Sequence, residues 1–203
     1  MKRLFAFVLS LLMLAGVFAD AVAVNNDDLD KLRKTKECSK CDLTGADLRG
    51  VNLSDANLKW AKMTATNLTK ADLSEADLLL ADLTDANLVG TILTSANLMR
   101  ANLKRANLTA AILIRSNLIG AKLVGAKMTG ANLTRANLSE ADLTLADLTR
   151  ANLTDASLWC AELTEANLSD ADLTRANLKG ANLKETKFCK TTMPDGTKDS
   201  SGC

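Results

Sequence analysis

The chain has 203 residues, of which 47% are apolar and 24% are charged, as expected for one soluble domain with a sizeable core. Aromatic residues make up only 3%, and both Tyr and His are absent, so the commonest general base and metal ligand is missing. The formal charge of +1 excludes the strong positive field that is typical of nucleic-acid-binding proteins.

The first 23 residues have the pattern of a secretory signal peptide. Lys2 and Arg3 precede an apolar run from Leu4 to Leu14, and small residues follow. Cleavage fits after Ala19 or after Ala23, with a slight preference for Ala19. A retained membrane anchor is the alternative, but the run is short beside the ~20 residues that span a bilayer. We therefore predict export, and no membrane association once this segment is removed.

Residues 24–40 are expected to form an N-terminal helical cap. In the stretch NNDDLDKLRKTKE, Leu29 and Leu32 are spaced as i and i+3, and acidic residues precede basic ones. That order of charges complements the dipole of a short helix. The helix would cover the first turn of the repeats that follow.

From residue 41 to residue 190 the sequence repeats every five residues without an insertion. Leu is the centre of every pentad from 43 to 183 apart from Met63 and Met128, and Phe188 is the last centre. Ala stands two positions before the centre in most pentads. The exceptions are Cys41, Val51, Thr66, Thr91, Ser116 and Thr186. A register held over this length is the strongest signal in the sequence.

The five-residue period is incompatible with a helical rod. In an α-helix each Leu would lie about 140° around the axis from the previous one, so no apolar stripe would form. Ala and Leu two residues apart instead share one side of a short extended segment, and two further residues turn the corner. One such unit buries too little by itself, so the units must stack as a solenoid.

The repeats SEADL, TDANL and KRANL resemble those of the pentapeptide-repeat family, and the resemblance covers about three quarters of the chain. It implies an all-β fold, a right-handed quadrilateral β-helix with four pentads in each coil. At ~4.8 Å between strands, residues 41–190 would form a rod roughly 36 Å long. The tail, residues 191–203, contains a Pro-Asp-Gly turn and is expected to leave the period.

Five cysteines in an exported chain suggest disulfides. A disulfide needs Cα atoms within about 7 Å, so the two ends of such a rod cannot be joined. We predict that Cys189 pairs with Cys203, that Cys38 pairs with Cys41 or stays reduced, and that Cys160 is a free thiol. The CxxC spacing also permits a thiol redox function through Cys38 and Cys41, although no thioredoxin-like pattern surrounds it.

No motif indicates catalysis, a cofactor or a metal site. Outward Asn, Asp, Ser and Thr are numerous, but a rod offers no cleft in which a carboxyl pKa would shift. The sequence also lacks a Gly-rich phosphate loop and any cluster with metal-ligand spacing. We therefore expect a protein that is not an enzyme and that binds no cofactor.

Some outward positions carry apolar residues where neighbouring pentads are polar. With 20 residues per coil, Ile92 and Ile112 would stack on one side, and Leu79, Met99 and Ile119 on the next. We predict a binding surface for a protein partner or a second copy in the middle coils. Its other members are Trp60, Leu80, Ile114 and Trp159. The alternative is that these residues have no role, since scattered aliphatic residues are normal on exposed strands.

The favoured function is an exported, non-catalytic interaction or scaffold module. The resemblance raises another function, because some pentapeptide-repeat proteins are similar to a DNA duplex and bind topoisomerases as acidic rods. Without residues 1–23 this chain is near neutral, which disfavours that role, and no nucleic-acid partner is expected. The tail FCKTTMPDGT resembles exported cyanobacterial members, which implies the periplasm or the thylakoid lumen.

Overall fold

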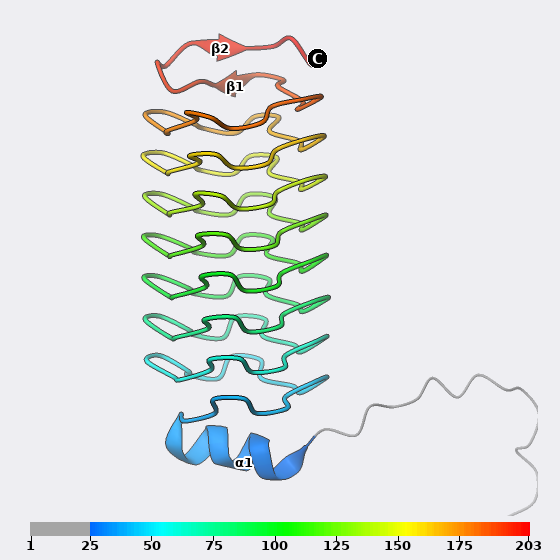
Figure 1. The fold of residues 1–203 in the computed structure, drawn as a ribbon, viewed down its shortest axis with the longest axis vertical. Helices are drawn as coiled ribbons and strands as arrows, with labels where there is room; N and C mark the ends of the chain where they lie inside the picture. Colours follow the sequence, from blue (N-terminus) through cyan, green and yellow to red (C-terminus); the bar gives the residue numbers. More distant parts are fainter. Residues whose placement is uncertain (1–24) are drawn as a thin grey trace, which may run out of the picture.

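The computed structural model describes residues 25–203, and in it stacked coils form a rod with a helix at one end and a hairpin at the other (Figure 1). The helix, α1, spans Asn26–Thr35, and the hairpin consists of β1 (Thr191–Thr192) and β2 (Lys198–Asp199). The predicted signal peptide lies outside the described residues. Within them, the ten-residue α1 does not approach the length that a membrane-spanning helix needs, and no membrane span is found.

The coil has a constant length of 20 residues. Single parallel bridges join residues 20 apart in an unbroken series, from Glu37 with Asn57 to Asp172 with Thr192. Four pentads therefore complete each coil, and residues at equivalent positions in successive coils form columns along the rod. We number the positions of a pentad −2, −1, 0, +1 and +2, where 0 is the central Leu.

The pentad from Ala81 to Asp85 shows how one repeat satisfies its five backbone N–H groups. The N–H of Asp82 donates to the preceding coil at 2.9 Å, and those of Leu83 and Asp85 donate to the next coil at 2.7 and 3.0 Å. The N–H of Ala81 closes the turn on the carbonyl of the preceding centre at 3.0 Å. The N–H of Thr84 is left, and it donates to Oδ1 of Asp82 at 3.1 Å. Asn or Asp at −1 therefore caps the turn as well as facing solvent.

The core is a column of aliphatic side chains along the axis of the rod. Every centre from Leu43 to Leu173 is buried, as are the Ala residues at −2 between Ala46 and Ala176. Burial of each Leu contributes about 2 kcal/mol before the loss of conformational entropy. The hydroxyl exceptions at −2 are satisfied as well, since Thr66 and Thr91 donate to Leu carbonyls in the preceding coil at 2.8 and 2.7 Å.

The corners are made by left-handed residues. Every +2 position from 40 to 190 has φ between 53° and 75°, and only seven of these positions are Gly. The sequence predicted two corner residues but not this conformation. A side chain with a Cβ is strained here by roughly 1 kcal/mol or more, and the regular ladder on both sides of each corner holds it in place.

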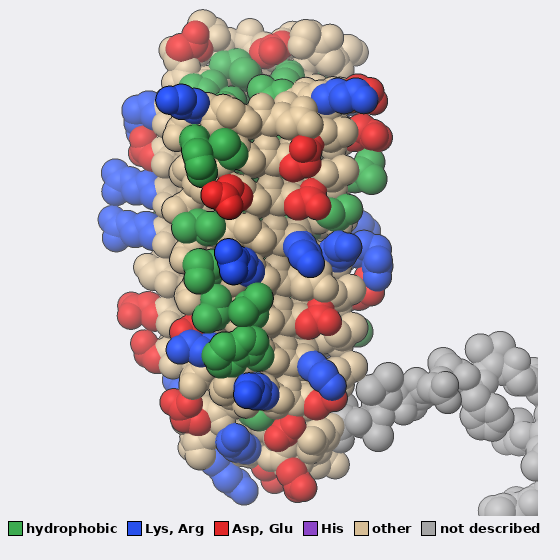
Figure 2. Space-filling view, viewed as in Figure 1, with side chains coloured by type: hydrophobic (Ala, Val, Ile, Leu, Met, Phe, Trp, Pro, Cys, Tyr) green, Lys and Arg blue, Asp and Glu red, His purple; other side chains and the backbone are tan. Residues whose placement is uncertain are grey.

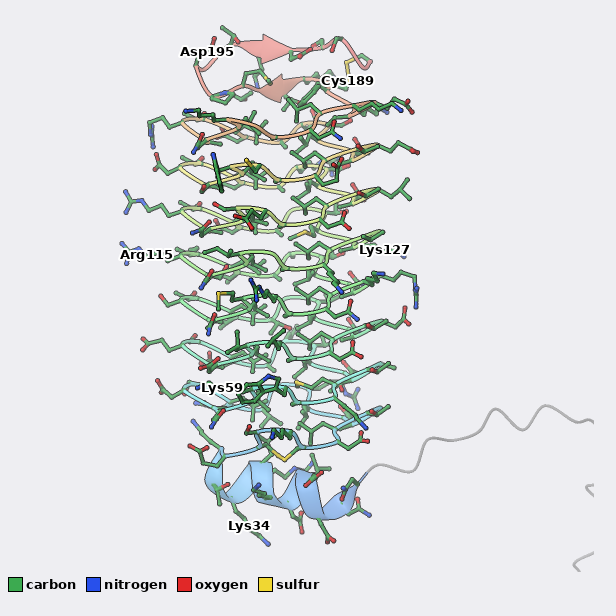
Figure 3. All side chains as sticks on the ribbon, in the orientation of Figure 1. Lys34, Lys59, Arg115, Lys127, Cys189 and Asp195 are labelled. Atoms are coloured by element: carbon green, nitrogen blue, oxygen red, sulfur yellow. A yellow bond between two sulfur atoms is a disulfide. The ribbon has the colours of Figure 1, made fainter. Side chains whose placement is uncertain are left out.

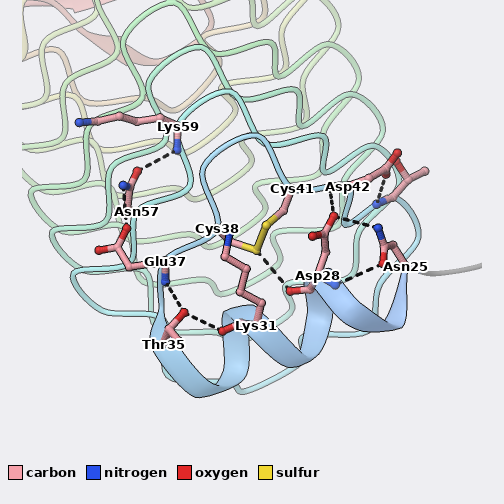
Figure 4. Close-up of a disulfide and its surroundings, with 11 residues drawn as sticks. Asn25, Asp28, Lys31, Thr35, Glu37, Cys38, Cys41, Asp42, Asn57 and Lys59 are labelled. Carbon is pink, nitrogen blue, oxygen red and sulfur yellow. Dashed lines mark hydrogen bonds between the residues drawn. A yellow bond between two sulfur atoms is a disulfide. The ribbon is translucent and has the colours of Figure 1, made fainter.

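At the N-terminal end, α1 closes the rod. Asn25 caps the helix by accepting from the N–H of Asp28, and Leu32 is buried in the core (Figure 4). Oδ2 of Asp28 also accepts from the N–H of Asp42 in the first coil at 2.8 Å. The bridges begin at Glu37, so the repeat starts one pentad earlier than residue 41, with Cys38 in the place of Leu.

At the C-terminal end, the expectation that the period stops at Phe188 is wrong. Thr192 still bridges to the preceding coil, and the carbonyl of Pro194 accepts from the N–H of Arg175 at 2.9 Å. Thr191 takes the place of Ala, and Met193 takes the place of Leu. The buried hydroxyl of Thr191 is satisfied, because it donates to the carbonyl of Leu168 at 2.7 Å. The chain then turns back, and β2 pairs antiparallel with β1.

Two disulfides lie at the ends of the rod. Cys38 and Cys41 have Cα atoms 5.2 Å apart, and Cys189 and Cys203 have Cα atoms 4.7 Å apart. Cys160 is unbonded and exposed. The first bond lies between α1 and the first coil, and the second ties the tail to the last coil (Figures 3 and 4).

Exchanging Ala for Gly, and Gly for Ala, at +2 positions of one column measures how much stability a side chain costs in the left-handed conformation. Ala110 and Gly130 occupy +2 in successive coils with φ of 55° and 65°. We expect Ala110→Gly to raise the free energy of unfolding by about 1 kcal/mol and Gly130→Ala to lower it by a similar amount, since a Cβ at Gly130 would meet no atom within 4 Å. Denaturant unfolding measures both, and equal stabilities would contradict the assignment of strain to this position.

The turn caps also predict a dependence on pH. Hydroxyl and backbone donors of Ser74 and Thr174 lower the pKa of Asp72 and Asp172. A lowered pKa contributes stability above the usual carboxyl range near pH 4, and this contribution is lost as the pH falls through the lowered value. We expect Asp72→Asn with Asp172→Asn to lose less stability between pH 5 and pH 2 than the parent, by up to about 1 kcal/mol per site. Parallel stability curves for parent and variant would contradict this.

Candidate interaction surface

The pentad determines which side chains can meet a partner. Positions −2 and 0 point into the core, −1 and +1 point outward, and +2 lies at a corner. Side I contains the centres from 53 to 173, and side II, the next side around the coil, contains those from 58 to 178. All nine residues of the predicted binding surface belong to these two sides.

Side II carries a column of apolar side chains at +1. Leu79, Met99 and Ile119 occupy successive coils, because the N–H groups following the first two donate to the carbonyls of Met99 and Ile119 at 3.1 and 2.9 Å. Each is half-buried. Figure 2 shows hydrophobic side chains gathered between charged ones on the face that is turned towards the viewer. Lys59, which is labelled in the same orientation in Figure 3, occupies the next position of the column towards α1.

The corner beside this column holds two large apolar residues in the strained conformation. Trp60 and Leu80 are successive +2 residues with φ of 56° and 58°, and each is 45% exposed. The ammonium of Lys40 lies 5.8 Å from the centroid of the Trp60 ring. Together with Leu79, Met99 and Ile119, these two residues make up what we call the apolar strip.

Side I carries Ile92 and Ile112 at −1, where they are joined by a parallel bridge. Neither side chain can accept the +1 N–H of its own turn. The N–H groups of Thr94 and Ile114 accordingly have no hydrogen-bond partner among residues 25–203, whereas that of Ser74, one coil earlier, donates to Asp72 at 2.9 Å. Among the described residues, the N–H groups of Thr64 and Thr129, which follow Lys at −1, also lack a partner, so the missing cap is not specific to the Ile positions.

The nine residues do not form one continuous surface. Asp77, Asn97 and Asn117 lie between the two groups as a polar ladder, in which Asn97 donates to the Asp77 carboxylate at 3.0 Å and Asn117 donates to Asn97 at 3.3 Å. Arg115 projects from the corner between the two sides (Figure 3). The structure thus assembles the apolar strip on side II and leaves Ile92, Ile112 and Ile114 as a separate group on side I.

Two exposed hydrophobic residues lie apart from both groups. Trp159, 42% exposed, is in the same column as Ile119 but two coils away, with Ser139 between them. Leu145, 55% exposed, stands at a corner of another side between Gly125 and Glu165. Leu145 is not a member of the predicted surface, and its neighbours in the column are not large apolar residues.

The geometry of the Cys38–Cys41 pair suits a structural bond. Both residues are buried, and Sγ of Cys38 lies 3.3 Å from the carbonyl oxygen of Asp28 in α1 (Figure 4). A redox couple requires an accessible thiolate, which this buried position between α1 and the first coil does not provide. The exposed thiol is that of Cys160.

The electrostatics contain no candidate for acid–base catalysis. Among the described residues, every carboxyl group with a displaced pKa has it lowered. For Asp85, the largest cause of the lowered pKa is the hydrogen bond from Arg105. A general acid that works near neutral pH needs a raised carboxyl pKa. Within residues 25–203, no three Cys, Asp or Glu side chains are grouped to hold a metal ion.

Comparisons with known proteins agree with this architecture. The sequence matches the family of pentapeptide repeats in eight copies, within residues 41–78, 80–113, 111–150, 131–170 and 156–193. No curated protein matches the chain.

Three solved structures are similar. HetL of the cyanobacterium Nostoc sp. strain PCC 7120, a pentapeptide-repeat protein involved in the regulation of heterocyst differentiation, is 29% identical, with 87% of this chain and 100% of HetL covered and a TM-score of 0.35. QnrB1, a plasmid-mediated fluoroquinolone resistance protein, is 18% identical, with 74% and 81% covered and a TM-score of 0.56, a likeness of fold alone. A pentapeptide-repeat protein of the Arabidopsis thaliana thylakoid lumen is 28% identical, with 53% and 79% covered and a TM-score of 0.35.

The family matches extend over more than half of the residues and coincide with the coils of the rod. Proteins with this repeat form right-handed β-helices and are generally non-enzymatic structural or interaction modules. This chain therefore belongs to the pentapeptide-repeat family.

Proposed function

We propose that this chain is an exported, non-catalytic interaction module that binds a protein partner through the apolar strip. The scaffold in this proposal is a right-handed quadrilateral β-helix capped by α1. The observation that carries the proposal is the concentration of Trp60, Leu80 and the +1 column on one side of a rod whose outward positions are mostly polar. A contiguous apolar area rimmed by charge is typical of a protein-binding site.

The cost of the apolar strip to folding supports this hypothesis. Trp60 and Leu80 adopt a conformation that favours Gly, and both still leave almost half of their surface in water. Folding gains little from such residues, whereas burial of a Trp and neighbouring aliphatic side chains at an interface contributes strongly to binding.

Export is the second part of the proposal, and it rests on two features of the chain. Lys2 and Arg3 followed by the apolar run have the pattern of a signal peptide, and both disulfide pairs suit an oxidising compartment. The compartment we propose is the periplasm or the thylakoid lumen.

The pentad itself supplies a conservative test of the strip. Thr is the commonest +1 residue, and its hydroxyl donates to the −1 side chain, as Thr109 does to Asn107 at 2.6 Å. We expect Leu79→Thr with Met99→Thr and Ile119→Thr to fold with a free energy of unfolding within about 1 kcal/mol of the parent. We also expect this variant to capture its partner from the exported fraction of the source cells at least tenfold less efficiently.

The matched control is Val89→Thr with Val124→Thr, which makes the same exchange at +1 on the other two sides. It should capture the partner as the parent does. Equal capture by both variants, together with unchanged sedimentation of the purified proteins, would remove the apolar strip as a binding site.

A further inference from the structure

Within the described residues, the C-terminal end of the rod is covered on only two of its four sides. The tail continues the ladder through Thr191 to Pro194 on side I, and Gly202 donates its N–H to the carbonyl of Phe188 at 2.6 Å on the preceding side. Among residues 25–203, none stacks above 176–185, which form the last described coil on side II and on the next side. Figure 1 shows the hairpin of β1 and β2 at this end.

These ten residues present a row of unpaired backbone groups, which we call the open edge. In earlier coils, the N–H groups at 0 and +2 donate to the next coil, and the carbonyl at −2 accepts from it. At the open edge the corresponding groups have no hydrogen-bond partner among the described residues: the N–H groups of Leu178, Gly180, Leu183 and Glu185, and the carbonyls of Ala176 and Ala181. Such a row is a template for one more strand.

The open edge also leaves part of the core uncovered. Leu178, Ala181 and Leu183 are only partly buried, whereas the same positions are fully buried one coil earlier. Figure 2 shows hydrophobic side chains at this end of the rod, with basic side chains to either side. A segment with small and aliphatic residues at −2 and 0 would continue the core.

The charge around the open edge is basic. Lys179 and Lys184 stand at +1 on its two sides, and Lys187 follows. Glu185 is the one acidic residue between 176 and 187, and its carboxylate lies 3.6 Å from the ammonium of Lys184. An acidic segment is therefore favoured over a neutral or basic one.

The same features disfavour a second copy of the chain. Two C-terminal ends placed together would bring their lysines face to face. A head-to-tail contact would have to displace α1, which closes the other end through buried Leu32 and the hydrogen bond from Asp42 to Asp28.

We propose that the open edge binds an extended acidic peptide segment of a partner, which adds to the rod as a further parallel strand. The bound segment alternates small or aliphatic residues with acidic ones. The tail already pairs in this way on side I, where the N–H of Leu173 donates to the carbonyl of Thr192 at 2.8 Å. This site is separate from the apolar strip.

The chain contains both a suitable probe and its control. A labelled peptide with the sequence of residues 71–79, ADLSEADLL, has the required apolar pattern and three acidic residues. The peptide of residues 101–109, ANLKRANLT, has the same pattern with two basic residues. Fluorescence anisotropy with the full, disulfide-bonded chain should show saturable binding of the first and at least tenfold weaker binding of the second.

Two changes separate strand pairing from attraction between charges. N-methylation of both Asp amides of the acidic peptide removes the donors for the carbonyls of Ala176 and Ala181, and it should weaken binding at least tenfold. Lys179→Glu with Lys184→Glu should also weaken it at least tenfold, whereas Lys104→Glu with Lys122→Glu, in the middle of the rod, should leave it within about twofold.

Three results would overturn the proposal. The first is equal binding of the two peptides, and the second is binding that N-methylation does not change. The third is a stable dimer of the parent chain that Lys179→Glu with Lys184→Glu alters, because it would assign the open edge to a second copy. Binding of a partner at the apolar strip is measured separately with the Thr variants, so the two sites can fail independently.

Discussion

The backbone N–H at +1 is the group on which this structure depends. The other four N–H groups of a pentad find carbonyl partners through the stacking of coils and the turn at the corner, as the repeat from Ala81 to Asp85 shows. The fifth has no carbonyl within reach, and an Asn or Asp side chain at −1 accepts from it in most pentads. The side-chain oxygen at −1 accepts a hydrogen bond from the N–H two residues further along the chain, and so provides the acceptor that the backbone ladder lacks. The core contributes the free energy, and this contact satisfies the remaining N–H wherever Asn or Asp stands at −1.

Much of this architecture could be predicted from the residues alone. Ala and Leu two apart, with polar residues between, require an extended segment with one buried side, and the constant period requires stacking. The left-handed corners could not be predicted, because residues as different as Trp60, Arg100 and Glu140 occupy them and only seven are Gly. The backbone ladder, not the side chain, determines φ there.

The limits of the repeat were also hidden from the sequence. Cys38 and Met193 occupy centres without a Leu, and the ladder accepts them because the backbone supplies most of the hydrogen bonds. The binding surface was predicted as one area, but the polar ladder from Asp77 to Asn117 divides it. The division arises because the −1 column of side II lies between side I and the +1 column of side II. The outer surface of the described rod thus departs from the repeat in two ways, with large apolar side chains at corners and aliphatic residues at capping positions.

Native-state hydrogen exchange of the +1 amides tests the role of the turn caps most directly. On side I, the amides of Ser74 and Thr134 donate to Asp72 and Asn132, whereas those of Thr94 and Ile114 follow Ile at −1 and have no such partner. We expect the two uncapped amides to exchange at least tenfold faster than the two capped ones, although all four lie in coils with bridged neighbours on both sides. Equal protection of all four amides would contradict this expectation.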